Sequence, residues 1–136
     1  MYEYRNAEHE ASHLHLFPTV YSLLLNLEPG STVLDLGCGN GSFISLFKHV
    51  GWNLYGVDSS VTGIEIAKKT YSDVTFFHAD AEHSEAEIIS RIGRVDAIIS
   101  TEVIEHVYAP RAFVQTICSV LKPGGVCIIT TPITAI

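Results

Sequence analysis

Alternating glycines directly follow a short apolar run and could form a ligand-binding turn. Gly37, Gly39 and Gly41 come after Val33–Leu36, and Asp35 lies inside that run. Glycine lets a ligand approach the backbone closely, and the start of a following helix would offer unpaired N–H groups. A carboxylate at Asp35 suits a ligand with an ammonium group better than one with a pyrophosphate. A tight strand-to-helix turn without a ligand is the alternative.

Two further carboxylates follow later apolar runs. Asp58 comes after Asn53–Val57, and a carboxylate about 20 residues beyond such glycines can accept hydrogen bonds from both hydroxyls of a ribose. Asp80 lies in "HADAE" beside Ala81, where a carboxylate and a backbone N–H can bind the amino edge of an adenine. Capping of the next helix is the alternative for both aspartates.

The segment "TEVIEHV", residues 101–107, combines two carboxylates with an imidazole. If it forms a helical turn, Glu102, Glu105 and His106 share one face at i, i+3 and i+4. Such a set predicts an acid–base centre or a site for a hard metal ion. A solvated polar turn is the alternative.

Hydrophobic periodicity and turn residues predict helices and strands that alternate along the chain. The expected strands are Thr32–Leu36, Asn53–Val57, Val74–Ala79, Val95–Ser100 and Val126–Thr131. The expected helices are Ala7–Leu27 with Pro18 inside it, Ser42–Val50, one capped by Ser59 or Ser60 that ends near Thr70, Glu85–Ile92 and Pro110–Leu121. Lys122 to Gly125, "KPGG", is expected to be a sharp turn before the last strand.

Three of the expected strands are apolar on both faces, namely Thr32–Leu36, Val95–Ser100 and Val126–Thr131. Such strands are typical of a parallel sheet between two helical layers. We therefore expect an α/β fold with an open, doubly wound, mostly parallel sheet and right-handed crossovers. Ligands of such sheets bind beyond the carboxyl ends of the strands. The glycines, the two aspartates and the segment 101–107 all follow strands, so they are predicted to form one site.

Composition limits the function classes. The chain has 136 residues, 47% of them hydrophobic, and a formal net charge of −7, which indicates one globular domain. No cluster of Lys or Arg is present, so binding to nucleic acid or to an anionic membrane is not expected.

Hydropathy and cysteine spacing also bear on the cellular location of the protein. The sequence has no apolar run long enough for a transmembrane segment, and its N-terminal residues do not resemble a signal peptide. Cys38, Cys118 and Cys127 have no CxxC spacing, so a disulfide framework or structural zinc is not expected. A cytoplasmic location is the simplest interpretation.

Taken together, the motifs resemble those of the class I S-adenosylmethionine-dependent methyltransferases. The matching pieces, in the family's order, are "VLDLGCGNG", "GVDSS", "HADAE", "STEVIEHV" and "LKPGG". The resemblance implies a Rossmann-like methyltransferase fold with strand order 3-2-1-4-5. It implies S-adenosyl-L-methionine as the cofactor, bound by Asp35, Gly37, Cys38, Gly39, Gly41, Asp58, Ser59, Asp80, Ala81 and Glu102. Dehydrogenases that bind a dinucleotide fit less well, because Ser42 stands where their third glycine should be.

Within that superfamily, "EVIEHV" is most similar to two groups. One is the ubiquinone-biosynthesis type of O-methyltransferase, which acts on phenolic substrates, and a small-molecule methyl acceptor is expected on this resemblance. The other is the small-RNA 3′-end methyltransferases, in which Glu-x-x-Glu-His binds a metal. The acidic charge and the lack of a further downstream histidine disfavour the second group. We therefore predict no metal ligand, while a divalent metal stays open as an alternative.

Methyl transfer to an oxygen requires removal of its proton. His106 is predicted to be the base, because an unperturbed imidazole titrates near neutral pH, and Glu105 or Glu102 is expected to orient it. His9, His13 and His15 are interpreted as a solvated helix face in preference to a lid.

The family normally continues beyond the fifth strand with a helix and two more strands, so residues 1–136 are expected to be a single domain truncated there, without strands 6 and 7. The fifth strand would then be an open edge, which favours self-association. A cofactor-binding or partner-completed module without independent catalysis is therefore an alternative function.

Overall fold

The computed structural model describes residues 8–133, and it describes side chains from residue 13 onward. Its strands are β1 (Thr32–Leu36), β2 (Asn53–Asp58), β3 (Thr75–His78), β4 (Val95–Thr101) and β5 (Leu121–Thr130). Its α-helices are α1 (Glu8–Leu23), α2 (Val61–Thr70), α3 (Glu85–Ile92) and α4 (Pro110–Val120), and two short 3-10 helices are η1 (Ile44–Phe47) and η2 (Ile104–His106). The predicted alternation of strands and helices is confirmed.

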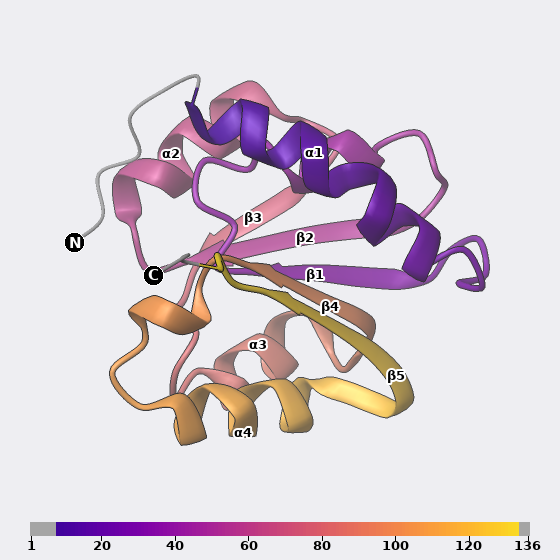
Figure 1. Cartoon of the computed structure of the whole chain (residues 1–136). Coiled ribbons are helices and arrows are strands. Elements are labelled where there is room, and N and C mark those ends of the chain that lie inside the picture. The colour runs from indigo at the N-terminus through magenta and orange to yellow at the C-terminus, as the bar shows by residue number, and fades with distance from the viewer. Residues whose placement is uncertain (1–7, 134–136) are drawn as a thin grey trace.

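The five strands form one parallel sheet in the order β3-β2-β1-β4-β5 (Figure 1). Asp35 of β1 pairs with Gly56 of β2 on one side and with Ile99 of β4 on the other. The order, the parallel direction and the doubly wound class predicted from the sequence are therefore confirmed. Because the strands are parallel, their carboxyl ends all lie on the same side of the sheet. The segments that follow β1 to β4 are therefore close together.

Helices cover both faces of the sheet, with α1 and α2 on one face and α3 and α4 on the other (Figure 1). Each face buries its own apolar cluster. Val20 of α1, Phe47 of η1 and Ala67 of α2 belong to the first cluster, whereas Ile88 of α3 and Phe113 of α4 belong to the second. Strands buried between these clusters read as continuous apolar runs, which explains why the sheet was predictable.

The α-helix expected at Ser42–Val50 is wrong, because the structure contains only the four residues of η1 there. Most backbone hydrogen bonds of this segment reach back three residues and not four. The N–H of Leu46 donates to the Phe43 carbonyl at 3.0 Å, and the N–H of Lys48 donates to the Ser45 carbonyl at 3.2 Å. Bonds of this spacing form a 3-10 helix. Consequently the glycines are not followed by an α-helix whose N-terminus could bind a ligand.

Two boundaries also differ from expectation by several residues, the end of α1 and the start of β5. Helix α1 contains Pro18 but ends at Leu23, four residues before the expected end, and the expected start at Ala7 lies outside the described residues. Lys122 to Gly125 form an irregularity inside β5, since Leu121 pairs with Val95 and Val126 pairs with Ala97.

None of the described helices is long and apolar enough to cross a membrane.

Strand β5 pairs with β4 alone and therefore forms one edge of the described sheet. Val126 and Ile129 on this strand are 37% and 40% exposed. That edge matches the expected open strand, and its pairing with a second chain stays a prediction.

Candidate functional site

A cavity of about 270 Å³ lies at the carboxyl ends of the strands. It is lined by the segments that follow β1, β2, β3 and β4, together with His13 of α1. Of the residues predicted to bind the cofactor or to act in catalysis, those that line the cavity are Asp35, Gly37, Cys38, Asp58, Ser59, Asp80, Ala81, Glu102 and His106. Gly39, Gly41 and Glu105 are not among its lining residues.

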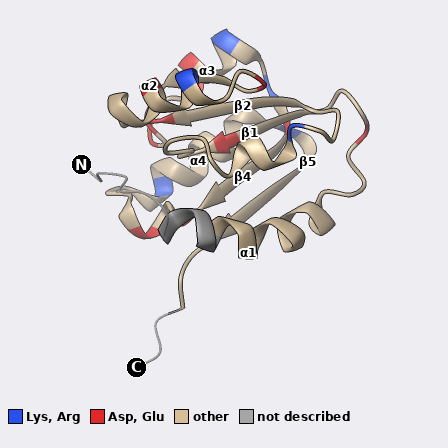
Figure 2. Ribbon diagram, turned by 90° about the horizontal axis from the view of Figure 1, so that it is seen from above, with Lys and Arg blue, Asp and Glu red and all other residues tan. Residues whose placement is uncertain are grey.

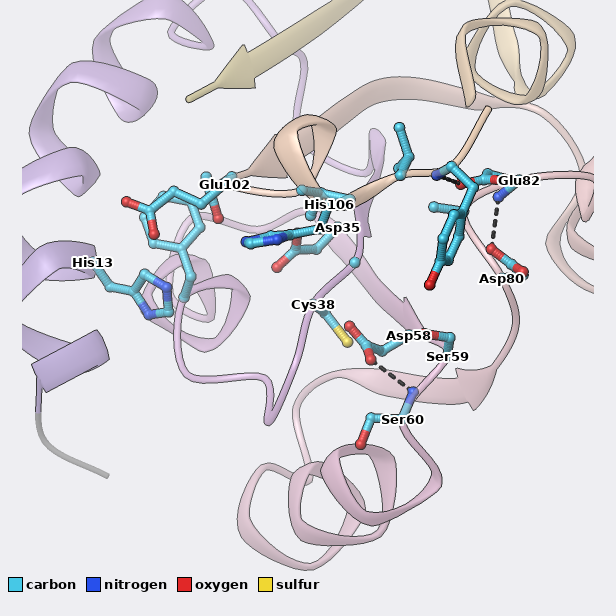
Figure 3. Close-up of a pocket in the computed structure, with 17 residues that line it drawn as sticks. His13, Asp35, Cys38, Asp58, Ser59, Ser60, Asp80, Glu82, Glu102 and His106 are labelled. Atoms are coloured by element: carbon cyan, nitrogen blue, oxygen red, sulfur yellow. Dashed lines mark hydrogen bonds between the residues drawn. The ribbon is translucent and has the colours of Figure 1, made fainter. Parts of the chain in front are cut away.

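Asp35 is a buried carboxyl group at the centre of this cavity (Figure 3). It is 1% exposed, and its Oδ1 atom has no hydrogen-bond partner among the described residues. Burial and, secondly, the charge of Asp58 raise the pKa of Asp35 to about 8. A buried carboxyl group without a partner is costly for the fold, whereas a cationic ligand group would pair with it.

Asp58 joins the glycine turn to the segment after β2. Its Oδ2 accepts the N–H of Gly39 at 2.9 Å, and its Oδ1 accepts the N–H of Ser60 at 2.8 Å. Burial raises the pKa of Asp58, and these two bonds oppose the rise. Ser60 caps α2 by accepting the N–H of Gly63. Asp58 therefore fixes the cavity wall and does not cap the helix, and a second lone pair on each oxygen can still accept a ligand hydroxyl.

Gly37 and Gly41 of the turn have different roles in the structure. Gly37 has a φ of +86° and lines the cavity, and a Cβ there would collide with Val103. Gly41 has a φ of +84°, and a Cβ there would lie 2.5 Å from the Phe76 ring. Gly41 is therefore required by packing between the turn and the sheet and not by contact with the cavity.

Cys38 is buried and lines the cavity between these glycines. Burial raises the pKa of its thiol well above the usual range, and the nearby Asp35 and Asp58 charges add to the rise. A protonated, buried thiol is a poor nucleophile. Cys38 therefore serves as a small apolar wall.

Asp80 and Ala81 lie at the end of the cavity that follows β3. Asp80 is exposed, and its Oδ1 accepts the N–H of Glu82 at 2.9 Å. Glu82 in turn accepts the N–H of Tyr108 at 2.8 Å, so two loops are tied together beside the cavity. This end offers a solvated carboxylate and a fully exposed aromatic ring at Tyr108.

The segment after β4 does not form the single helical face that was expected. Glu102 has a φ of +58° and donates its N–H to the Thr130 carbonyl at 2.9 Å, so it lies outside the 3-10 turn Ile104–His106. Glu102 and His106 both line the cavity, whereas Glu105 does not. Within residues 8–133, no group of three or more His, Cys, Asp or Glu side chains is placed to hold a metal ion.

Glu105 lies beside His106 and is anchored by the end of the edge strand. Its Oε1 is 3.7 Å from His106 Nε2, and its Oε2 accepts a hydrogen bond from Thr131 Oγ1 at 3.0 Å. Glu105 therefore lies against the imidazole from outside the cavity.

Sequence reasoning missed several lining residues, namely His13, Phe43, Ser60, Glu82, Val103, Val107 and Tyr108. Most of them lie within a few residues of a predicted site residue, but His13 comes from α1. His13 is half-buried, and its Nδ1 is 2.9 Å from Ser42 Oγ. The interpretation of the histidines as a solvated helix face is therefore wrong for His13, whereas His15 is exposed; the side chain of His9 lies outside the described residues.

The sequence of the chain is similar to those of known proteins. Residues 5–135 match a family model described as a methyltransferase domain. A ubiquinone biosynthesis O-methyltransferase of Bradyrhizobium sp. is 34% identical over 107 residues, and the match covers 79% of this chain and 42% of the relative. A protein with the same name from Cereibacter sphaeroides is 32% identical over 103 residues, and this match covers 75% of this chain and 41% of the relative. The chain thus spans about two fifths of the length of these curated relatives.

Solved structures share the fold. A methyltransferase of Geobacter sulfurreducens in complex with S-adenosyl-L-homocysteine superposes with a TM-score of 0.59 at 25% identity, over 82% of this chain and 45% of that chain. The magnesium protoporphyrin IX methyltransferase of Synechocystis PCC 6803 superposes with a TM-score of 0.65 at 22% identity. This superposition covers 89% of this chain and 58% of that chain.

Proposed function

The chain belongs to the methyltransferase domain family, and from that premise we propose that it transfers a methyl group from S-adenosyl-L-methionine to an oxygen atom of a small molecule. The curated relatives at about one third identity are named O-methyltransferases, which supports oxygen as the acceptor atom. Among the described residues that line the cavity none is Lys or Arg, which supports an acceptor without phosphate groups.

The observation that carries the proposal is the unpartnered oxygen of Asp35 in the cavity. The cofactor carries an ammonium group on its methionine part, and an ionised Asp35 would bind it in a charge-assisted hydrogen bond. Asp58 would hold the ribose hydroxyls, and Asp80 with the backbone of Ala81 would hold the adenine. Asp35, Asp58 and Asp80 follow one another across the cavity (Figure 3), in the order that these three parts of the cofactor require.

When bound, the cofactor supplies a methyl group that its positively charged sulfur has already activated. The protein's remaining task is to position the acceptor and to remove its proton. His106 lines the cavity, and an imidazole is suited to accept a proton near neutral pH. Glu105, 3.7 Å from His106 Nε2, would orient the ring and stabilise it once it is protonated.

His106→Ala is expected to lower kcat by about 100-fold, because a general base contributes roughly that factor or more. The dissociation constant of S-adenosylhomocysteine should change by less than about threefold, because the base acts on the acceptor. Turnover at saturating cofactor measures the first quantity, and calorimetry measures the second. His49→Ala is a suitable control, because His49 is exposed and does not line the cavity. Unchanged turnover would show that His106 is not the base.

The acceptor atom is tested with cofactor labelled with tritium in its methyl group. Catechol serves as a hydroxyl acceptor and aniline as a nitrogen acceptor of similar size. The proposal predicts label on catechol and little on aniline. A folded protein that binds S-adenosylhomocysteine yet labels neither compound would instead support a cofactor-binding module without independent catalysis.

A further inference from the structure

The end of strand β5 lies beside the segment that follows β4. Thr101 and Thr130 form the last pair of the ladder between these strands, and the N–H of Glu102 donates to the Thr130 carbonyl at 2.9 Å. Thr131 comes next in the chain, and its Oγ1 donates to Glu105 Oε2 at 3.0 Å. One backbone bond and one side-chain bond therefore join the end of the edge strand to the segment that carries the proposed base.

The local chain restricts the direction in which the Thr131 hydroxyl can point. Pro132 follows Thr131, and a residue before proline is biased toward extended backbone conformations. The branched Cβ of threonine also limits rotation of its side chain. The hydroxyl can therefore hold a carboxylate in one place better than a long and flexible donor could.

Glu105 depends on such a donor, because no basic side chain holds its carboxylate. Lys and Arg residues are sparse in this acidic chain, which has 8 of them against 15 Asp and Glu residues (Figure 2). Within residues 13–133, the ion pairs formed by Lys or Arg do not include Glu105. The Thr131 hydroxyl is therefore the group that anchors the carboxylate on the side away from His106.

This anchor matters because the pair of Glu105 and His106 is partly open to water. The His106 side chain is 60% exposed and the Glu105 side chain is 27% exposed. An ion pair in contact with water contributes little when both side chains can move, and more when its geometry is fixed. Holding Glu105 from the β5 side keeps its Oε1 beside His106 Nε2.

We infer that Thr131 is a positioning residue for methyl transfer, acting on His106 through Glu105. Its hydroxyl holds the Glu105 carboxylate, and that carboxylate orients the imidazole and stabilises the ring once it is protonated. The inference rests on the proposed function, because it assumes that His106 removes the proton of the acceptor.

Thr131→Val tests the role, because it replaces the hydroxyl with a methyl group of similar size. The kcat for methylation of catechol should fall about fivefold, the effect of losing one hydrogen bond. The KM for catechol and the dissociation constant of S-adenosylhomocysteine should change by less than about twofold, since Thr131 does not line the cavity. Thr131→Ser retains the hydroxyl and should keep at least about half of the wild-type kcat.

Thr130→Val is the matched control at the neighbouring position. Thr130 Oγ1 is buried and has no hydrogen-bond partner among the described residues, and valine keeps the carbonyl that accepts the Glu102 N–H. Its kcat should stay within about twofold of the wild-type value, because no hydrogen bond is lost. In a Glu105→Gln background, Thr131→Val should lower kcat by a smaller factor than it does in the wild-type protein, because both residues act through one contact.

Crystal structures of the ligand-free protein test the positioning without any turnover. Glu105 and His106 should stay within about 4 Å of each other in the wild-type protein and in Thr131→Ser, and should lie farther apart in Thr131→Val. A Thr131→Val protein that keeps this contact, that has the wild-type kcat, or that loses no more activity than Thr130→Val would overturn the role of Thr131. If the wild-type protein methylated no acceptor, the proposed function itself would fail, and the crystal structures would still decide whether Thr131 holds Glu105.

Discussion

Asp35→Asn is expected to weaken binding of S-adenosylhomocysteine by about 100-fold. Loss of one partner from a buried charged pair typically costs 2 to 5 kcal/mol, and about 2.7 kcal/mol corresponds to 100-fold. An asparagine of the same shape keeps the cavity but cannot supply the negative charge that the ammonium group requires. Calorimetric titration of the variant and the wild-type protein at pH 8 measures the change.

The same substitution should stabilise the protein without ligand. The pKa of Asp35 is raised to about 8 from its ordinary value of 3.8, so the folded state binds more protons than the unfolded state between these values. The free energy of unfolding of the wild-type protein therefore falls as pH rises through this window. Asparagine does not ionise, so the free energy of unfolding of the variant should increasingly exceed that of the wild-type protein between about pH 4 and pH 8. The difference should then level off at a value on the order of 2–4 kcal/mol.

Asp96→Asn is the matched control. Asp96 lies near the amino end of β4, whereas the cavity lies at the carboxyl ends of the strands. Its Oδ2 accepts the N–H of Thr32, and its Oδ1 accepts a hydrogen bond from Lys122 Nζ at 3.1 Å. The Thr32 bond lowers the pKa of Asp96, so this substitution should destabilise the protein slightly and leave ligand binding unchanged. An Asp35→Asn protein that binds S-adenosylhomocysteine normally, or that is less stable than wild type at pH 8, would contradict the role of Asp35.

Gly41→Ala is expected to destabilise the protein by about 2–5 kcal/mol, from two separate causes. A side chain at a φ of +84° costs roughly 1–2 kcal/mol. The new Cβ would also lie 2.5 Å from the Phe76 ring and 3.1 Å from Ala67 Cβ, and overpacking of this kind costs about 1–3 kcal/mol. Urea unfolding monitored by circular dichroism measures the sum.

Gly30→Ala separates the two causes. Gly30 has a similar φ of +86°, but nothing lies within 4 Å of a Cβ built there. Only the backbone cost should appear, about 1–2 kcal/mol. Combining Gly41→Ala with Phe76→Leu should cost less than the sum of the two single changes, because the smaller side chain makes room. Equal effects of Gly30→Ala and Gly41→Ala would show that packing against Phe76 is unimportant.

The parts of the site that follow strands were predictable from the sequence. Asp35, Asp58, Asp80 and His106 are far apart along the chain, yet all four line one cavity. Parallel strands place their carboxyl ends at one edge of the sheet, so recognising the strands was sufficient to bring these residues together. The central strands β1 and β4 were recognisable because both of their faces are buried.

Other features depend on contacts that no local pattern contains. Gly41 matches the motif as well as Gly37 does, but only the packing of Phe76 shows that its role differs. The expected α-helix after the turn is replaced by a short 3-10 helix, whose backbone hydrogen bonds reach back three residues and not four. His13 reaches the cavity because α1 packs over the glycine turn, and its distance in sequence from the other site residues gave no signal of that placement.

Calorimetric titration of the wild-type protein with S-adenosylhomocysteine at pH 7, in two buffers of different ionisation enthalpy, tests most directly whether Asp35 binds the cofactor. At this pH an Asp35 with a pKa of about 8 is mostly protonated, and it must ionise to pair with the ligand's ammonium group. We predict binding at one site with release of about one proton, and a much smaller release at pH 9. A folded protein that binds no S-adenosylhomocysteine, or that binds it at pH 7 without releasing a proton, would contradict this role of Asp35.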